Sequence, residues 1–223
     1  MPNKVLPPSG PGRPKDLVKR KAILEAAKSL FLSRGYDGSS MDVIAAEAGV
    51  SKLTVYSHFT DKETLFAEAV KSKCEEQLPE LLFELNDDAP IDQVLLGIGR
   101  GFNALINSRE SVELHRVMVS LAAQDSKLSR LFYEAGPQRV LNGMEALLRR
   151  ADQHGKLRVS NPLSAADHFF CLIKGGANFR LLIGCGDAPQ GDAAEAHVRD
   201  AVSVFLRAFR ADQIGRASCR VRV

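Results

Sequence analysis

Apolar residues recur every three or four positions along most of the chain, which is the spacing of one face of an α-helix. The clearest stripe follows Leu17, and its members are Ile23, Ala26, Ala27, Leu30 and Phe31. It stops at Gly35, a residue that readily takes the left-handed conformation at a helix C-terminus. No stretch alternates apolar and polar residues for long enough to indicate a strand. The pattern therefore predicts an all-α protein.

Continued along the chain, the same spacing predicts about nine helices. They are expected at residues 17–34, 41–48, 52–59, from 60 or 61 onward, 91–106, 110–123, 126–153, 162–183 and 192–211. Ser40 and Ser51 are expected to cap the second and third helices, because serine side chains accept hydrogen bonds from the first backbone amides. Gly136-Pro137 lies inside the segment 126–153, so we expect a kink or a break there.

Four parts are expected along the chain. Residues 1–16 form a flexible basic arm, since the five prolines among the first 14 residues oppose both a helix and a central strand. Residues 17–63 form a small helical domain, and residues 64–214 form a larger one. Residues 215–223 are basic and interrupt the helical pattern. They resemble vector read-through or an altered reading frame, with a short native tail as the alternative.

Composition and targeting signals favour a folded cytoplasmic protein. The 223 residues are 45% hydrophobic and 26% charged, which is typical of globular domains and unlike a disordered chain. The chain has no apolar run of about 18 residues that would span a membrane, and no N-terminal stretch like a signal peptide. Its four cysteines form neither a CxxC pair nor a disulfide framework.

Positive charge is concentrated in the first quarter of the chain. Residues 1–60 contain nine Lys and Arg against five Asp and Glu, which gives a net charge of +4. The other 163 residues contain 21 against 22, a net charge of −1, or −4 without the three arginines of the tail. This asymmetry indicates that the N-terminal end meets a polyanion.

The segment 40–62, SMDVIAAEAGVSKLTVYSHFTDK, has the layout of a helix-turn-helix. Two short helices flank Gly49-Val50-Ser51, where glycine permits the sharp turn and serine starts the second helix. In such a unit the second helix enters the major groove of DNA. Val55 and Phe59 are four residues apart and are expected to face the core. The remaining polar side chains then face the groove or the phosphates, and they are Lys52, Thr54, Tyr56, Ser57 and His58.

The run from Ile23 to Ala69 resembles the DNA-binding domain of the TetR/AcrR family of bacterial transcriptional regulators. The elements in register are Phe31, Gly35-Tyr36, Ile44-Ala45-x-x-Ala48-Gly49-Val50-Ser51, Tyr56-x-x-Phe59 and Lys62-x-x-Leu65. The rest of the chain resembles the family only in length and helicity. The resemblance implies a homodimer that binds a double-stranded DNA operator.

The resemblance also implies which residues contact DNA. They are Ser40, Lys52, Leu53, Thr54, Tyr56, Ser57, His58 and Lys62, and the full set of candidate DNA contacts adds Ser51 and Arg13. Within it, Ser40 and Lys62 would hold phosphates, and residues 52–54 would approach base edges. Leu53 departs from the family, where this position is often small, and it either reads a thymine methyl group or packs. Arg13 lies in Gly12-Arg13-Pro14-Lys15, which is either a minor-groove arm or a solvated tail.

Two further sets follow for the larger domain. The candidates to line an effector pocket, each with an ordinary core position as the alternative, are Phe102, Met118, Leu121, Phe132, Leu141, Met144 and Phe170. The last two helices would form the dimer interface of the family through Phe169, Leu172, Gly176, Phe179, Val198, Val202, Phe205 and Phe209.

No pattern for catalysis, a metal or a cofactor emerges. The five histidines lack ligand spacing, and Gly97-x-Gly99-x-Gly101 lies inside a helical stripe rather than after a strand. We therefore expect no enzyme, no metal and no cofactor. The sequence predicts a transcriptional regulator, foremost a repressor released from a palindromic operator by a small, largely apolar effector. The alternatives are an effector-independent DNA-binding dimer controlled by a protein partner, and an all-α ligand-binding enzyme.

Overall fold

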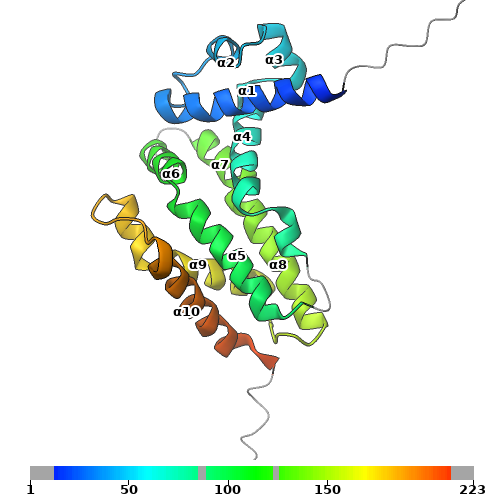
Figure 1. Cartoon of the computed structure of the whole chain (residues 1–223), viewed down its shortest axis with the longest axis vertical. Helices are drawn as coiled ribbons and strands as arrows, with labels where there is room; N and C mark the ends of the chain where they lie inside the picture. The colour runs from blue at the N-terminus through cyan, green and yellow to red at the C-terminus, as the bar shows by residue number, and fades with distance from the viewer. Residues whose placement is uncertain (1–12, 85–88, 123–125, 212–223) are drawn as a thin grey trace, which may run out of the picture. The chain divides into compact units, whose positions relative to one another are not determined.

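The computed structural model describes residues 13–84, 89–122 and 126–211. These residues form ten α-helices and one 3₁₀-helix, and their only β-type pairing is a single bridge between Leu157 and Arg210 (Figure 1). The predicted all-α fold is confirmed. The tail expected at 215–223 and most of the arm expected at 1–16 lie outside the described residues.

The chain divides into two compact units, residues 1–69 and residues 70–223. The helices of the first unit are α1 (Arg13–Arg34), α2 (Met41–Glu47), α3 (Lys52–His58) and the start of α4 (Lys62–Gln77). The division falls inside α4, six residues after the boundary expected at residue 63. The reason is that Phe66 packs into the first unit, with its ring 5.3 Å from Phe31 and 5.4 Å from Tyr36 between centroids.

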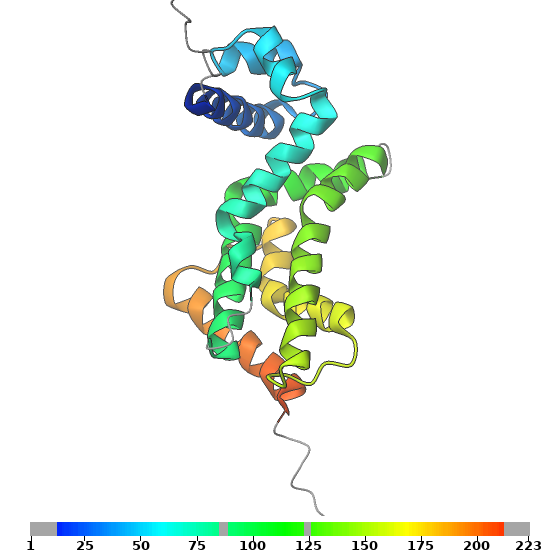
Figure 2. The ribbon, with the colours of Figure 1, turned by 90° about the vertical axis from the view of Figure 1, so that its right-hand side faces the viewer.

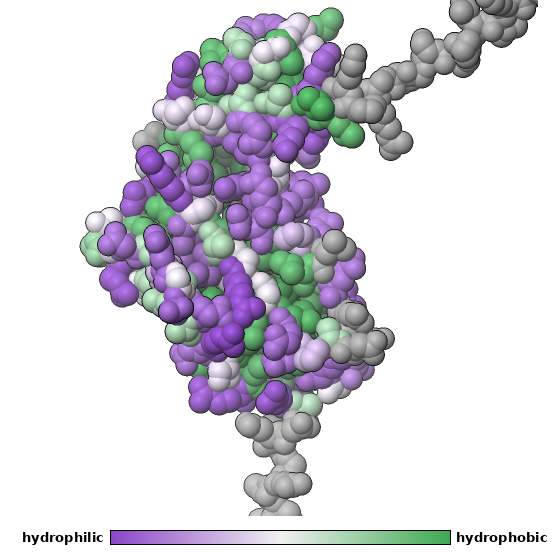
Figure 3. Space-filling view, viewed as in Figure 1, coloured by the Kyte–Doolittle hydropathy of each residue, from purple (hydrophilic) through white to green (hydrophobic). Residues whose placement is uncertain are grey.

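The predicted stripe of α1 is confirmed, because all five of its apolar residues are buried. The start of α1 differs from the expectation. The helix begins at Arg13, whereas the non-helical arm was expected to extend to Asp16. Pro14 falls in the first turn, where an amide has no partner within the helix, so proline is tolerated there. Near this end Leu17 and Val18 remain exposed, and hydrophobic surface shows at the same end of α1 in Figure 3.

The second unit contains the end of α4 and seven further helices. They are η1 (Glu80–Phe83), α5 (Ile91–Asn107), α6 (Arg109–Leu121), α7 (Ser126–Ala135), α8 (Pro137–Gln153), α9 (Pro162–Leu182) and α10 (Gly191–Phe209). Helix α9 packs against α5, α8 and α10, and Figure 2 shows it between α5 and α8. The expected break near residue 136 is confirmed, since Gly136 ends α7 and caps α8, and Pro137 opens α8.

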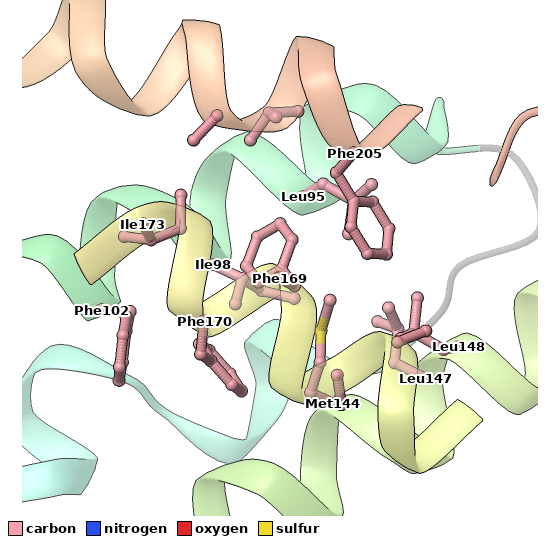
Figure 4. Close-up of a cluster of buried hydrophobic side chains, with 14 of the residues drawn as sticks. Leu95, Ile98, Phe102, Met144, Leu147, Leu148, Phe169, Phe170, Ile173 and Phe205 are labelled. Carbon is pink, nitrogen blue, oxygen red and sulfur yellow. The ribbon is translucent and has the colours of Figure 1, made fainter. Parts of the chain in front are cut away.

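Phe169 of α9 lies at the centre of the core of this unit (Figure 4). Its ring meets Phe205 of α10 edge-on at 5.2 Å and Phe170 at 5.5 Å between centroids. Leu95 and Met144 bring α5 and α8 to the same cluster, and neither side chain is exposed. Four helices therefore share one core.

This core corrects the expected dimer interface. Four residues assigned to that interface are buried inside the protomer, namely Phe169, Val198, Val202 and Phe205. Leu172 and Phe209 are half-buried and pack against the same core. Only Gly176 and Phe179 are exposed. Because α9 and α10 bury their apolar stripes against helices of their own chain, those stripes are not available to a partner.

Helix α9 bends at Gly175, which has φ +55° and non-helical backbone angles. Next to the bend, the ring of His197 on α10 donates a hydrogen bond from Nε2 to the carbonyl of Ile173 at 2.8 Å. A Cβ atom at position 175 would lie 2.8 Å from Cε1 of His197. Glycine is therefore required here both by the backbone angle and by the close approach of the histidine.

Candidate nucleic-acid interface and ligand cavity

The turn between α2 and α3 is fixed by backbone hydrogen bonds. The amide of Val50 donates to the carbonyl of Ala45 at 3.0 Å, and that of Gly49 donates to Ala46 at 3.2 Å. This pair of bonds is a Schellman motif, which requires the left-handed conformation at the residue after the helix. Gly49 supplies it with φ +65°. The predicted role of this glycine is confirmed.

Side-chain caps start both short helices as predicted. The hydroxyl oxygen of Ser40 accepts from the amide of Val43 at 3.3 Å, and that of Ser51 accepts from the amide of Thr54 at 3.1 Å. The Ser51 and Thr54 hydroxyls are also 2.8 Å apart. Thr54 is therefore half-buried and held by the cap rather than fully presented to solvent.

Helix α3 is anchored by the predicted core pair. Val55 and Phe59 have 0% and 1% of their surface exposed. The guanidinium of Arg20 on α1 lies 5.2 Å from the centre of the Phe59 ring, and its Nη2 donates to Glu68 of α4 at 2.5 Å. The buried pair and the contact of Arg20 with Phe59 hold α3 against α1, so the opposite face of α3 is fixed in direction.

That opposite face carries Lys52, Leu53, Tyr56 and Ser57, all exposed. Leu53 is 80% exposed, which means that it does not pack within this chain. Nζ of Lys52 lies 2.8 Å from a carboxylate oxygen of Asp42, and this hydrogen bond raises the pKa of the lysine. The face thus offers one cation, hydroxyl groups and one large apolar side chain.

Two predicted contacts occupy other positions. His58 does not join the exposed face, because its side chain is only 10% exposed and its Nε2 lies 3.2 Å from Asp16 on α1. It comes three residues after Val55 and next to Phe59, so its helical position leans toward the core. Nζ of Lys62 donates to the carbonyl of Tyr36 at 3.0 Å and lies 4.0 Å from the centre of its ring. Lys62 therefore uses part of its hydrogen-bonding capacity within the first unit.

The predicted DNA contact Arg13 is the first residue of α1.

The second unit encloses a cavity of about 170 Å³, bordered by α4, α5, α6, α7, α8 and α9. Four of the seven predicted pocket residues line it, namely Phe102, Phe132, Leu141 and Phe170. Met118, Leu121 and Met144 do not line it. Met144 instead lies in the core beside Leu147 and Leu148 (Figure 4). Periodicity places such residues inside the bundle and leaves open which of them border empty space.

Polar groups that sequence reasoning missed also line this cavity. Nδ1 of His115 on α6 donates to the carbonyl of Ser111 at 2.7 Å, and the ring meets Phe132 edge-on at 5.4 Å. Burial, and to a smaller extent Lys174, lowers the pKa of His115. Burial raises the pKa of the Cys74 thiol to about 11, so this group is also neutral near pH 7.

Helix α9 presents Asp167, Phe170 and Lys174 to the cavity. Their spacing of three and four residues places them on one face of the helix, and this is the signal by which the sequence could have marked them. Asp167 and Lys174 are exposed, so their charges lie where the cavity meets solvent.

The described residues contain neither a metal-binding cluster nor a membrane-spanning helix. No group of three or more histidine, cysteine or acidic side chains is arranged to hold a metal ion in residues 13–84, 89–122 and 126–211. Within the same ranges, none of the helices has both the length and the hydropathy needed to cross a lipid bilayer.

Family profiles match both units. Residues 23–69 match the family described as bacterial regulatory proteins, tetR family. Residues 93–211 match the family described as AefR-like transcriptional repressor, C-terminal domain. The first match covers the helix-turn-helix, and the second covers most of the helices around the cavity.

Whole-chain relatives agree with these matches. The uncharacterized HTH-type transcriptional regulator YdeS of Bacillus subtilis is 28% identical over 93% of this chain and 96% of its own length. A putative TetR-family transcriptional regulator from Mesorhizobium loti is 32% identical, with a TM-score of 0.72 over 88% of this chain and 98% of that chain. The flavonoid-responsive regulator FrrA is 30% identical, with a TM-score of 0.67 over 87% and 98%.

Proposed function

The chain belongs to the TetR family of bacterial transcriptional regulators, and from this premise we propose that it is a repressor released from its operator by a small, largely apolar effector. It is a DNA-binding regulator with a ligand-binding C-terminal unit. The proposal adds that two copies bind a palindromic operator and that the effector occupies the cavity of the second unit.

The observation that carries the DNA side of the proposal is the exposed face of α3. Lys52, Tyr56 and Ser57 point away from a core that fixes the helix through Val55 and Phe59. Lysine, tyrosine and serine are typical donors to phosphate oxygens and base edges. Because the buried face of α3 is already packed, its exposed side chains can bind DNA without a large loss of conformational entropy.

Release requires that ligand binding changes the affinity for DNA, which is a coupling between two sites. Helix α4 supports such a coupling, because it starts in the first unit and supplies Val70, Lys73 and Cys74 to the cavity wall. A ligand that binds better to one position of α4 shifts the population toward that position.

The dimer part of the proposal rests on the exposed surface of α9 rather than on its buried stripe. Phe179 and Ile183 are 63% and 60% exposed at the end of α9, where Arg116 donates to the carbonyls of Leu181 and Leu182. Large exposed apolar side chains on a well-anchored helix end are typical of a protein interface.

Selection from a random duplex library tests DNA binding. The expected product is an inverted repeat, with half-sites about one helical turn or a related spacing apart. Replacing Tyr56 by Ala should weaken binding to the selected site. Glu113→Ala, on the exposed part of α6, is the matched control and should leave it unchanged. Recovery of no enriched sequence would contradict the proposal.

Light scattering tests the dimer. Phe179→Asp should give monomers, because a carboxylate would be buried against the partner copy. Leu53→Asp, a change of another exposed apolar residue, should leave the dimer intact while it impairs DNA binding. An unchanged dimer in Phe179→Asp would move the interface away from the end of α9.

A further inference from the structure

We propose that the cavity of the second unit takes a hydroxylated aromatic molecule, a phenol, whose hydroxyl group donates a hydrogen bond to Nε2 of His115. This inference rests on the proposed function, since it takes the cavity to be the effector site. It adds the chemical class of the effector and the residue that selects it.

The walls of the cavity favour an aromatic ring. Phe102, Phe132 and Phe170 come from α5, α7 and α9, three helices that are separate in the sequence. The rings of Phe102 and Phe170 are 4.4 Å apart between centroids and tilted by 47°. Aromatic side chains favour offset and edge-on contacts with other rings, so a flat ring gains more here than an aliphatic chain of equal area.

The polar group of the cavity is an acceptor. Nδ1 of His115 must carry the hydrogen that it shares with Ser111, because a carbonyl oxygen only accepts. In the neutral ring Nε2 then holds a lone pair, and burial keeps the ring neutral by lowering its pKa. No hydrogen bond joins Nε2 to another described residue. Since none of the buried side-chain nitrogens and oxygens of these residues lacks a partner, Nε2 is accessible rather than buried, and His115 lines the cavity, so we take this atom to face the cavity.

Two lysines line the cavity with His115, and neither is a fully buried cation. Lys73 of α4 lies 3.5 Å from Glu110 and 3.9 Å from Glu76, so its charge is already balanced. Lys174 and Asp167 of α9 are exposed and of opposite sign.

The other titratable groups of the cavity add no positive charge. The Cys74 thiol of α4 is neutral at pH 7, and Tyr133 of α7 is half-exposed. A carboxylate placed against the neutral imidazole would lack a partner, which is costly in a buried site. A neutral hydroxyl meets the acceptor without that cost.

Calorimetry on the full-length protein at pH 7.5, without DNA, tests the proposal with a matched pair of probes. 2-Naphthol has the hydroxyl donor, and 2-methoxynaphthalene has the same rings without it. Wild-type protein should bind 2-naphthol about tenfold more tightly, equivalent to about 1.4 kcal/mol. His115→Phe should abolish this preference, and His115→Gln, which keeps an acceptor, should retain most of it.

His168→Gln is the control, because this exposed residue of α9 does not line the cavity. Thermal melting checks that each variant folds. Equal binding of the two probes to the wild type, or binding of neither, would overturn the proposal. Tighter binding of 2-naphthoate that is lost in Lys174→Ala would also overturn it, in favour of an anionic ligand. Because DNA is absent, failure to find an operator would count against the proposed function and leave this measurement standing.

Discussion

The two units use helices in opposite ways. Of the seven residues of α3, only Val55 is buried, and most of the others are exposed to solvent. Helix α5 in the second unit buries eight of its seventeen residues. A polyanion is recognised by side chains that water reaches, whereas an apolar molecule is recognised by a space from which water is excluded. We therefore expect binding specificity to lie on the outside of one unit and in the interior of the other.

The contrast also separates recognition from stability. Substitutions on the exposed face of α3 are expected to remove contacts made only when DNA is bound. Substitutions of buried residues in the second unit remove contacts that hold the fold together.

The largest effect is expected in the core of the second unit. Phe205→Ala removes a ring that is 1% exposed and packs against Phe169 and Phe209. The expected loss is about 3–5 kcal/mol in the free energy of unfolding, measured by urea denaturation. Val119→Ala, at a side chain of α6 that is 77% exposed, should change it by less than about 0.5 kcal/mol. Similar losses for the two would mean that Val119 is covered in the native protein.

Replacing glycine by alanine tests the two units with the same substitution. Gly49→Ala meets open space, so only the left-handed backbone opposes it, at about 1–2 kcal/mol. Gly175→Ala combines a similar angle with the contact to His197, so it should cost more. Gly97→Ala is the control, because a Cβ there meets only Leu82 at 3.8 Å and alanine favours a helix. Chemical denaturation of the three variants gives the order, and a cost at Gly49 equal to that at Gly175 would contradict it.

A phosphate contact by Lys62 would increase the dependence of DNA affinity on salt concentration. Lys62→Ala should lower the log–log slope of DNA affinity against salt by about 0.9, on the selected site and on random DNA alike. It should also lower the melting temperature of the first unit slightly, because the contacts with Tyr36 are lost. Lys62→Arg keeps the positive charge, so it should retain most of the wild-type slope. A lower melting temperature with an unchanged slope would make Lys62 a structural residue only.

Leu53 was expected either to contact a thymine methyl group or to pack, and since it does not pack within this chain we propose the methyl contact. Replacing individual thymines of the selected site by uracil removes only that methyl, and one replacement per half-site should cost the wild type about 0.8 kcal/mol. Leu53→Ala should bind both DNAs equally and melt like the wild type, because the side chain is 80% exposed. Insensitivity of the wild type to every such replacement would show that Leu53 reads no methyl group.

The smallest effect concerns pH. Since the folded pKa of His115 is lowered, the unfolded chain takes up a proton more readily than the folded one. The contribution of this residue to stability is therefore complete above about pH 6.5, the ordinary histidine pKa, and is lost as pH falls below it. His115→Phe should flatten the fall in urea midpoint between pH 7.5 and pH 5, with His168→Gln as the control. A fall as steep as in the wild type would place the titrating group elsewhere.

The sequence predicted the first unit well because its signals are local. The caps Ser40 and Ser51, the turn glycine and the pair Val55 and Phe59 all lie within a few residues of the structure that they specify. His58 was misplaced because it flanks that pair, and its partner Asp16 is distant in the sequence.

The second unit was harder to predict because its site is assembled from separate helices. An apolar stripe has the same pattern whether it packs on its own chain or on a partner, so the buried Val202 and Phe205 were assigned to a dimer. The surroundings of His115 include Phe132 and Lys174, which come from two other helices. Distances of this kind arise from packing rather than from spacing along the chain.

The course of α4 has a consequence for protein engineering. Since the helix passes from one unit into the other at residues 69 and 70, the units are not modules joined by a linker. A chimaera that combines the second unit of this chain with the DNA-binding unit of a relative should be joined after the position of Ala69. A joint at residue 63 would separate Leu65 and Phe66 from the core that they complete. The joint must also keep the register of the helix, because one inserted residue rotates the following residues of α4 by about 100° about the helix axis.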